Sequence, residues 1–284
     1  MSAAQDLGPG LYLVATPIGN LEDITFRAIR VLKQVDVIAC EDTRQTQKLL
    51  NHYGIETRTV SYHQHNERSR AAELGEELAQ GGRVAVVSDA GMPGISDPGF
   101  RLVSAAIERG VPVVPVPGAA AFASALVASG LPGETFKFHG FLPPKSSARR
   151  RRLEPLRNSG ETEIFYEAPH RISETLEDVV AILGAERRIV VARELTKIHE
   201  EFLRGPAGEI LEKIRSRGDV RGEITLLIGP TGGEQNRAVP VSVRDRIDEI
   251  MREEKLGQKE ALKKAAKERG ISKSEAYREW QKTR

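Results

Sequence analysis

Short apolar runs alternate with amphipathic segments through the first part of the chain. Continuous apolar runs separated by helical patterns are typical of a parallel sheet with helices on both faces. The predicted strands are 11–15, 37–40, 57–62, 84–87 and 111–116. The predicted helices are 26–35, 48–53, 71–80 and 97–110. The last helix is expected to open on Asp97-Pro98, an N-cap residue followed by proline at the first helical position.

The same alternation starts again near residue 131, which predicts a second α/β domain. Its predicted strands are 136–142, 163–166, 188–192 and 224–228, and its predicted helices are 150–158, 173–183 and 207–217. A polar linker at 231–236 precedes three short predicted helices, 243–254, 259–269 and 273–281. The expected organisation is an N-terminal α/β domain over 10–122, a second over 131–230, and a basic, RNA-binding helical extension over 238–284.

Charge is distributed unevenly along the 284 residues. Residues 237–284 carry 14 Lys and Arg against 9 Asp and Glu, whereas the remainder carries 28 against 31. A basic appendage on a nearly neutral body favours an anionic macromolecule such as RNA as a partner, although a solvated helical tail has the same composition.

Several classes of protein are disfavoured by the sequence. Cys40 is the only cysteine, which excludes an intramolecular disulfide, and it is expected inside a strand. His63 and His65 lack a third candidate ligand, so no metal site is predicted. Met1–Gly10 does not resemble a secretory signal, and four prolines interrupt the uncharged run Val111–Gly133. We therefore expect a soluble cytoplasmic protein that does not enter a membrane.

Three loops rich in Gly and Pro follow predicted strands of the first domain: Thr16–Leu21, Ser88–Gly99 and Pro115–Ala120. Ligands of parallel α/β sheets bind beyond the carboxyl ends of the strands, and glycine allows a ligand to approach the main chain closely. The chain has neither the dinucleotide motif G-x-G-x-x-G after its first strand nor the P-loop motif, which argues against dinucleotide binding and triphosphate hydrolysis.

Five motifs occur in a fixed order: Thr16-Pro17-Ile18-Gly19-Asn20-Leu21-Glu22-Asp23, Glu41-Asp42-Thr43-Arg44, Ser88-Asp89-Ala90-Gly91-Met92-Pro93-Gly94-Ile95-Ser96-Asp97-Pro98-Gly99, Glu167-Ala168-Pro169-His170-Arg171 and Arg193-Glu194-Leu195-Thr196-Lys197. This series closely resembles the ribosomal RNA small-subunit methyltransferase I family, a branch of the tetrapyrrole methylase superfamily. The resemblance covers residues 10–230, and the tail is similar to that family's C-terminal extension.

The resemblance implies two α/β domains of tetrapyrrole-methylase type with S-adenosyl-L-methionine in the interdomain cleft, and a homodimer. It also implies 2′-O-methylation of a cytidine ribose in the decoding centre of 16S rRNA, cytidine 1402, with naked rRNA or the small ribosomal subunit as substrate. Motif matching assigns the cofactor contacts to Ile18, Gly19, Asn20, Asp89, Ala90, Gly91, Met92, Pro93, Pro117, Gly118 and Ala119.

A ribose hydroxyl is a poor nucleophile at neutral pH, so a base that removes its proton would accelerate transfer. The candidates are Glu41, His170 and Glu194. Each has a structural alternative: Glu41-Asp42-Thr43-Arg44 is also typical of a helix cap with an ion pair, His170 follows a proline and is also placed to begin a helix, and Glu194 is a candidate ion-pair partner of Arg171 or Arg193.

The densest basic cluster comprises Lys145, Arg149, Arg150, Arg151 and Arg152. We predict that it forms an RNA-binding rim, and the alternative is a solubilising helix. Two other functions fit the motifs. One is a precorrin- or uroporphyrinogen-type tetrapyrrole methyltransferase, which the basic tail and arginine cluster disfavour. The other is a non-enzymatic RNA-binding ribosome-assembly factor, which the intact cofactor loops disfavour.

Overall fold

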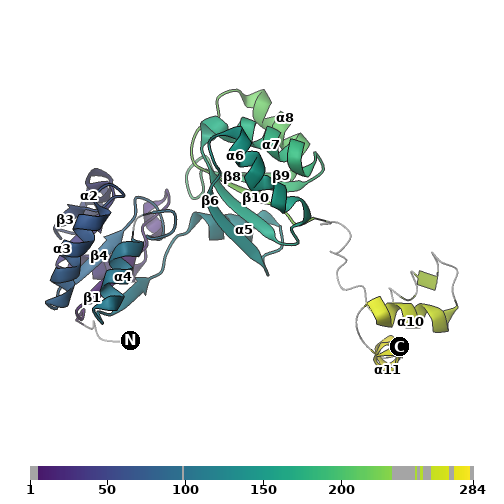
Figure 1. Ribbon diagram of the computed structural model, residues 1–284, viewed down its shortest axis with the longest axis horizontal. Coiled ribbons are helices and arrows are strands. Elements are labelled where there is room, and N and C mark those ends of the chain that lie inside the picture. The colour runs from purple at the N-terminus through teal and green to yellow at the C-terminus, as the bar shows by residue number, and fades with distance from the viewer. Residues whose placement is uncertain are drawn as a thin grey trace. The chain divides into compact units, whose positions relative to one another are not determined.

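The computed structural model describes residues 6–97, 99–231, 247, 250–251, 257–268 and 272–281. The chain divides into two compact units, 1–231 and 232–284. The first unit holds two five-stranded sheets with their helices (Figure 1). No helix among the described residues is long and apolar enough to cross a membrane.

The first sheet is entirely parallel, with strand order β3-β2-β4-β1-β5, as the apolar runs predict. Its strands are β1 (Gly10–Val14), β2 (Val37–Cys40), β3 (Thr59–Ser61), β4 (Arg83–Val87) and β5 (Val113–Val116). Its helices are α1 (Phe26–Gln34), α2 (Thr43–His52), α3 (Glu67–Ala79) and α4 (Phe100–Glu108).

Successive residues of each strand serve opposite cores, because side chains alternate across a sheet. Leu11 packs in a cluster with residues of α3 and α4, whereas Tyr12 packs in a second cluster with residues of α1 and α2. Cys40 is fully buried in the cluster that contains Tyr12, as expected for a strand residue.

The predicted start of the fourth helix is wrong. α4 begins at Phe100 with Gly99 as its N-cap, and not at Asp97-Pro98. Gly99 has a φ of 155°, and its N–H donates to Glu67 Oε1 of α3 at 3.2 Å. This contact with a distant helix ends the loop later than the local N-cap pattern indicates.

The second sheet is mixed, with strand order β6-β7-β10-β8-β9 and only the β6–β7 pair parallel. Its strands are β6 (Phe136–Phe141), β7 (Thr162–Glu167), β8 (Arg188–Arg193), β9 (Glu201–Pro206) and β10 (Ile224–Ile228). Its helices are α5 (Ala121–Ser129), α6 (Ser146–Leu153), α7 (Ile172–Leu183) and α8 (Ala207–Arg217). Neither α5 nor β9 is predicted by the sequence pattern.

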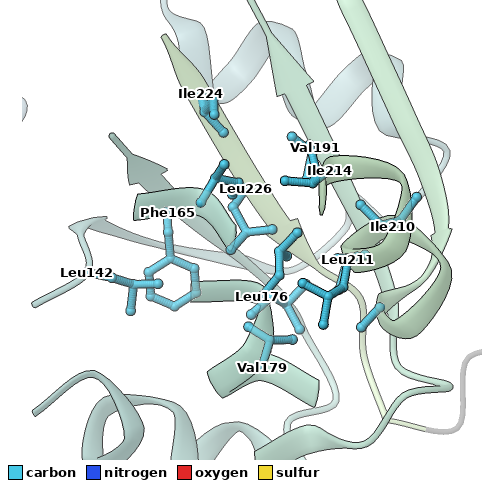
Figure 2. Close-up of a cluster of buried hydrophobic side chains, with 14 of the residues drawn as sticks. Leu142, Phe165, Leu176, Val179, Val191, Ile210, Leu211, Ile214, Ile224 and Leu226 are labelled. Atoms are coloured by element: carbon cyan, nitrogen blue, oxygen red, sulfur yellow. The ribbon is translucent and has the colours of Figure 1, made fainter. Parts of the chain in front are cut away.

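The two faces of the second sheet differ. Figure 2 shows one face, where Phe165, Val191 and Leu226 of the strands pack against side chains of α7 and α8 such as Leu176 and Ile210. The other face packs against α5, and Ile18 from the loop after β1 joins that cluster. A residue of the first sheet's edge is therefore part of the second sheet's core.

The second unit contains α10 (Gln258–Glu268) and α11 (Lys273–Gln281) among its described residues. They correspond to two of the three predicted helices, and most of the predicted helix 243–254 lies outside the described residues. Its core comprises Ile247, Ile250, Ala261, Leu262, Ala265, Ala266 and Ala276, with Met251 and Trp280 partly buried against it. The domain boundaries at 122, 131, 230 and 238 stay predictions.

Candidate active site

The three Gly- and Pro-containing loops meet at the carboxyl edge of the first sheet and are joined through their main chains. Thr16 N–H donates to Gly91 O at 2.9 Å, and Gly91 N–H donates to Thr16 O at 3.1 Å. Ala15 N–H donates to Val116 O at 3.1 Å, which connects the third loop. Hydroxyls reinforce the second loop, because Ser88 Oγ donates to Gly91 O at 2.9 Å.

Two glycines allow these loops to pack closely. A Cβ at Gly118 would lie 2.8 Å from the Ala15 Cβ, a distance that side chains do not tolerate. Gly91 has a φ of 86°, a left-handed conformation that favours glycine, and a Cβ there would lie 3.3 Å from Ile18 Cγ2. The shape of the edge is therefore fixed by backbone contacts.

A cavity of about 460 Å³ opens beside these loops, between them and the second sheet. Five of the eleven predicted cofactor residues line it: Ile18, Asp89, Ala90, Gly91 and Met92. The other six lie in the same loops but do not line the cavity: Gly19, Asn20, Pro93, Pro117, Gly118 and Ala119. Asn20 instead caps a short 3-10 helix, where its side chain accepts from Glu22 N–H at 3.1 Å.

Carboxylates dominate the polar lining on the first sheet's side, where Glu41, Asp89 and Asp97 face the cavity. Burial and the neighbouring carboxylates raise the pKa of all three. The largest effect is at Asp97, where burial, Glu41 and Asp89 raise the pKa to about 6. The local sequence around Asp97 predicts a helix cap and does not predict that this carboxylate lines a cavity.

Residues at the ends of second-sheet strands form the opposite wall. Phe141 ends β6 and is 58% exposed, and Tyr166 packs edge-on against it with ring centroids 5.6 Å apart. Glu167 also lines the cavity, but its carboxylate accepts from Arg171 Nη2 and Thr175 Oγ1, both at 2.6 Å. Phe141 therefore offers aromatic surface to a ligand, whereas the carboxylate of Glu167 is already paired with Arg171.

Of the three predicted catalytic residues, only Glu41 lines the cavity. His170 lies in a 3-10 helix over Pro169–Arg171 and is exposed, which agrees with the helix-start alternative. Glu194 accepts from Lys197 Nζ at 2.8 Å and from Glu223 N–H at 3.0 Å, so neither predicted partner, Arg171 or Arg193, is its ion-pair partner in the structure. Burial alone would raise the pKa of Glu194. The hydrogen bonds from Lys197 and from Glu223 N–H have the larger combined effect, so the pKa of Glu194 is lowered.

The helix-cap interpretation of Asp42 is confirmed: Asp42 is the N-cap of α2, and its Oδ1 accepts from Arg44 N–H at 2.8 Å. The adjacent Glu41 is left on the cavity side. Asp42 N–H in turn donates to Asp89 Oδ1 at 3.2 Å, which joins the loops after β2 and β4.

The arginine cluster does not act as one surface. Arg149 is 1% exposed, and its Nε donates to Asp178 Oδ2 at 2.7 Å. The prediction that Arg149 contacts RNA is therefore wrong, because a buried, paired guanidinium is not accessible to phosphate. Lys145, Arg150, Arg151 and Arg152 are exposed, and their role in RNA binding stays a prediction.

Residues 10–211 match the family model described as Tetrapyrrole (Corrin/Porphyrin) Methylases. The chain is 49% identical over 270 residues to "Ribosomal RNA small subunit methyltransferase I" of Halalkalibacterium halodurans, covering 94% of this chain and 93% of that protein. It is 46% identical to the protein of that name from Bacillus subtilis, covering 94% and 92%, and 44% identical to that from Escherichia coli O157:H7, covering 94% and 93%.

Solved structures share the fold at lower identity. The methyltransferase CobJ superposes with a TM-score of 0.59 at 20% identity, covering 78% of this chain and 94% of that one. Uroporphyrin-III-C-methyltransferase from Thermus thermophilus superposes with a TM-score of 0.53 at 20% identity, covering 78% and 94%. Both likenesses concern the fold alone.

Proposed function

The chain belongs to the ribosomal RNA small subunit methyltransferase I family of the tetrapyrrole methylases, and on that basis we propose that it methylates the 2′-oxygen of a cytidine ribose in 16S rRNA, cytidine 1402 of the decoding centre. The general activity, S-adenosylmethionine-dependent methylation of ribosomal RNA, follows from family membership. A substrate of this kind implies a cytoplasmic enzyme.

One observation carries the assignment of the cofactor site: three backbone-joined loops form one wall of a cavity whose lining is both apolar and acidic. S-adenosyl-L-methionine supplies an electrophilic methyl group on a positively charged sulfur. Ile18 and Met92 offer apolar contacts to such a ligand, and the carboxylates of Asp89 and Asp97 complement its positive charge. Ala90 is exposed on the cavity wall, where a ligand can approach its main chain closely.

Two features support RNA as the methyl acceptor. The exposed side chains of Lys145, Arg150, Arg151 and Arg152 provide positive charge on and next to α6. Phe141 offers an exposed ring at the cavity mouth, and single-stranded RNA is commonly held by stacking its bases on aromatic side chains. We retain the homodimer and the RNA-binding role of the C-terminal extension as predictions.

The proposal is tested by incubating the protein with methyl-labelled S-adenosylmethionine and either naked 16S rRNA or isolated small subunits from a strain lacking the activity. The expected result is label on a single cytidine ribose, mapped by mass spectrometry of nuclease fragments. Label on a base would contradict ribose methylation. Transfer to a tetrapyrrole and not to RNA would instead identify a macrocycle methylase.

The cofactor site is tested by calorimetry on Asp89→Ala. Asp89 lines the cavity, so its removal is expected to weaken cofactor binding by about tenfold or more while the unfolding temperature changes little. Asp219→Ala is the matched control, because Asp219 is 72% exposed and pairs only with Arg221 among the described residues. Unchanged cofactor affinity in Asp89→Ala would remove Asp89 from the site.

A further inference from the structure

Strand β6 carries one residue more than its partner β7 between two matched pairs. Phe138 pairs with Ile164 and Phe141 pairs with Tyr166, so three steps along β6 correspond to two along β7. Gly140, within the irregular stretch, has a φ of 68°, a left-handed conformation that β-bulges commonly place on glycine. Side chains alternate across a regular strand, so without the extra residue Phe138 and Phe141 would point to opposite faces. The bulge instead puts Phe141 on the face of Phe138 and Tyr166.

That face lines the cavity, and Phe141 lies at its edge. Tyr166 lines the cavity too, and its ring centroid is 5.6 Å from that of Phe141. β6 is an edge strand of the second sheet, and Phe141 is 58% exposed. Among the large hydrophobic side chains that are exposed in the described part of the chain, Phe141 is the one that lines the cavity. Its ring therefore contacts Tyr166 and still offers much of its surface to a ligand.

The residue before the bulge glycine, His139, holds this backbone from the opposite face. Its ring stacks on Phe165, with centroids 4.6 Å apart and an interplanar angle of 11°. A guanidinium can only donate, so His139 Nδ1 accepts from Arg152 Nη2 at 2.9 Å. His139 Nε2 therefore carries the proton of a neutral imidazole and donates to Glu163 Oε2. Glu163 is 1% exposed, so the ring of His139 is fixed by a buried group.

The bulge is held on two further sides. Ser159 Oγ donates to Glu163 Oε1 at 2.5 Å, which fixes the acceptor of His139. A Cβ at Gly140 would lie 3.2 Å from Ser96 Oγ, so the bulge also lies against the loop after β4. Bulges are frequent next to active sites, where they re-aim a side chain. The side chain that this bulge turns toward the cavity is that of Phe141.

We propose that Phe141 is the surface on which the base of the acceptor nucleotide stacks, and that His139 is a positioning residue that aims this ring. The inference rests on the proposed function, because it needs a nucleotide as the methyl acceptor. The residues proposed for the cofactor, such as Ile18 and Asp89, belong to loops of the first sheet, whereas Phe141 lies at the edge of the second. A base stacked on Phe141 keeps its own ribose at the cavity, where the methyl donor is proposed to bind.

The ring is tested by steady-state methyl transfer to 16S rRNA or small subunits, whichever the wild type methylates. Loss of the stack is expected to lower kcat/KM for RNA by roughly 10- to 100-fold in Phe141→Ala. Leucine fills space without stacking, so Phe141→Leu is expected to stay within about threefold of Phe141→Ala, whereas Phe141→Trp stays within about threefold of the wild type. Phe26→Ala is the matched control, because Phe26 is 94% exposed and does not line the cavity.

Calorimetry with S-adenosylmethionine in the absence of RNA separates the acceptor from the cofactor. The cofactor Kd of Phe141→Ala is expected to change by less than about threefold, because the proposed cofactor contacts lie on the first sheet's loops. A Kd that weakens as much as kcat/KM falls would place Phe141 against the cofactor and overturn the proposal. Wild-type kcat/KM in Phe141→Ala, or equal kcat/KM in Phe141→Leu and Phe141→Trp, would also overturn it.

The positioning role of His139 is tested with a double-mutant cycle. His139→Ala is expected to lower kcat/KM for RNA by about tenfold and to cause no further loss in a Phe141→Ala background. His139→Gln, whose amide can still donate to Glu163, is expected to recover most of the rate. His139→Ala also releases Arg152, so the slope of log RNA affinity against log salt concentration is measured as well, and it is expected to keep its wild-type value. Additive losses, no recovery in His139→Gln, or a slope reduced by about one would each overturn this role.

The outcome also distinguishes the two proposals. If the wild type methylates a ribose in RNA and Phe141→Ala does so equally well, the stacking assignment fails and the proposed function stands. If the wild type transfers the methyl group to a tetrapyrrole and not to RNA, the proposed function fails, and the stacking assignment fails with it.

Discussion

The two sheets of the first unit bury polar groups of different kinds. Around the first sheet, the buried polar side chains of the described residues are all uncharged: Thr16, Thr46 and Ser88. Around the second sheet, buried charged side chains are frequent: Arg149, Glu163, Glu167, Asp178 and Arg187. The loops at the first sheet's edge are thus held together by main-chain contacts, whereas the second sheet is stabilised by buried side-chain ion pairs and hydrogen bonds.

Carboxylates illustrate this difference, because Glu41 and Asp97 at the cavity and the buried Asp178 of α7 have opposite pKa shifts. The carboxylates of Glu41 and Asp97 face the cavity without a donor among the described residues, and their pKa values are raised. The carboxylate of Asp178 is buried among Arg149 and Arg150, and although burial opposes its charge, the hydrogen bonds from Arg150 and Arg149 lower its pKa. The former group is available to a ligand and the latter is not.

Removal of Asp178 is expected to have the largest effect. Asp178→Ala leaves the buried Arg149 guanidinium without its main partner, which costs about 3–5 kcal/mol of unfolding free energy. Urea denaturation followed by circular dichroism measures this loss. Asp219→Ala, which breaks an exposed pair with Arg221, is expected to change stability by no more than about 0.5 kcal/mol. Equal effects of the two substitutions would contradict the structural role assigned to the buried pair.

The same pair predicts an acid-sensitive stability. Because the folded pKa of Asp178 is lowered, its contribution is full above the unfolded value of about 3.9 and is lost as the pH falls through the folded value. The wild type is therefore expected to lose more stability than Asp178→Asn as the pH falls from about 5 to 2. Unfolding temperatures across this range measure the difference, and parallel losses in the two proteins would show that other carboxylates cause it.

Gly118→Ala addresses the first sheet, where backbone geometry is expected to matter most. The added methyl would lie 2.8 Å from the Ala15 Cβ, so the loops after β1 and β5 must separate. The expected cost is about 1–3 kcal/mol of unfolding free energy, together with weaker cofactor binding in calorimetry. Gly160→Ala is the control, because a Cβ at Gly160 has no neighbouring atom of the described residues within 4 Å. Normal stability and cofactor affinity in Gly118→Ala would mean that the loops adjust without strain.

The first sheet was largely predictable because hydropathy reports burial directly. Apolar runs gave β1, β2, β4 and β5 within a few residues, and their common direction placed the loops on one edge. α5 was missed because this helix contains no charged residue and has no polar face that would reveal a helical period. β9 was missed because Glu201 and Arg204 interrupt its apolar residues.

The candidate site was only partly predictable because its decisive contacts join distant segments. Asp97 has the local pattern of a helix cap, but α4 begins at Phe100, where the preceding Gly99 N–H bonds to Glu67, 32 residues earlier. Arg149 lies in α6, which begins at Ser146, four residues before the predicted start, and its partner Asp178 lies 29 residues later in the sequence. A run of basic residues does not show by itself that one of them is buried against a distant carboxylate.

The smallest expected effect concerns the exposed part of the arginine cluster. Arg151 is exposed on α6, and no ion pair among the described residues involves it, so Arg151→Glu is expected to leave stability unchanged within about 0.5 kcal/mol. If Arg151 contacts a phosphate, the substitution reduces the slope of log affinity against log salt concentration by about one, uniformly across RNA sequences. Filter binding of 16S rRNA at salt concentrations from about 50 to about 200 mM measures the slope, because salt weakens phosphate contacts strongly over this range. An unchanged slope would leave α6 as a helix that packs on the second sheet through Arg149 and presents Arg151 only to solvent.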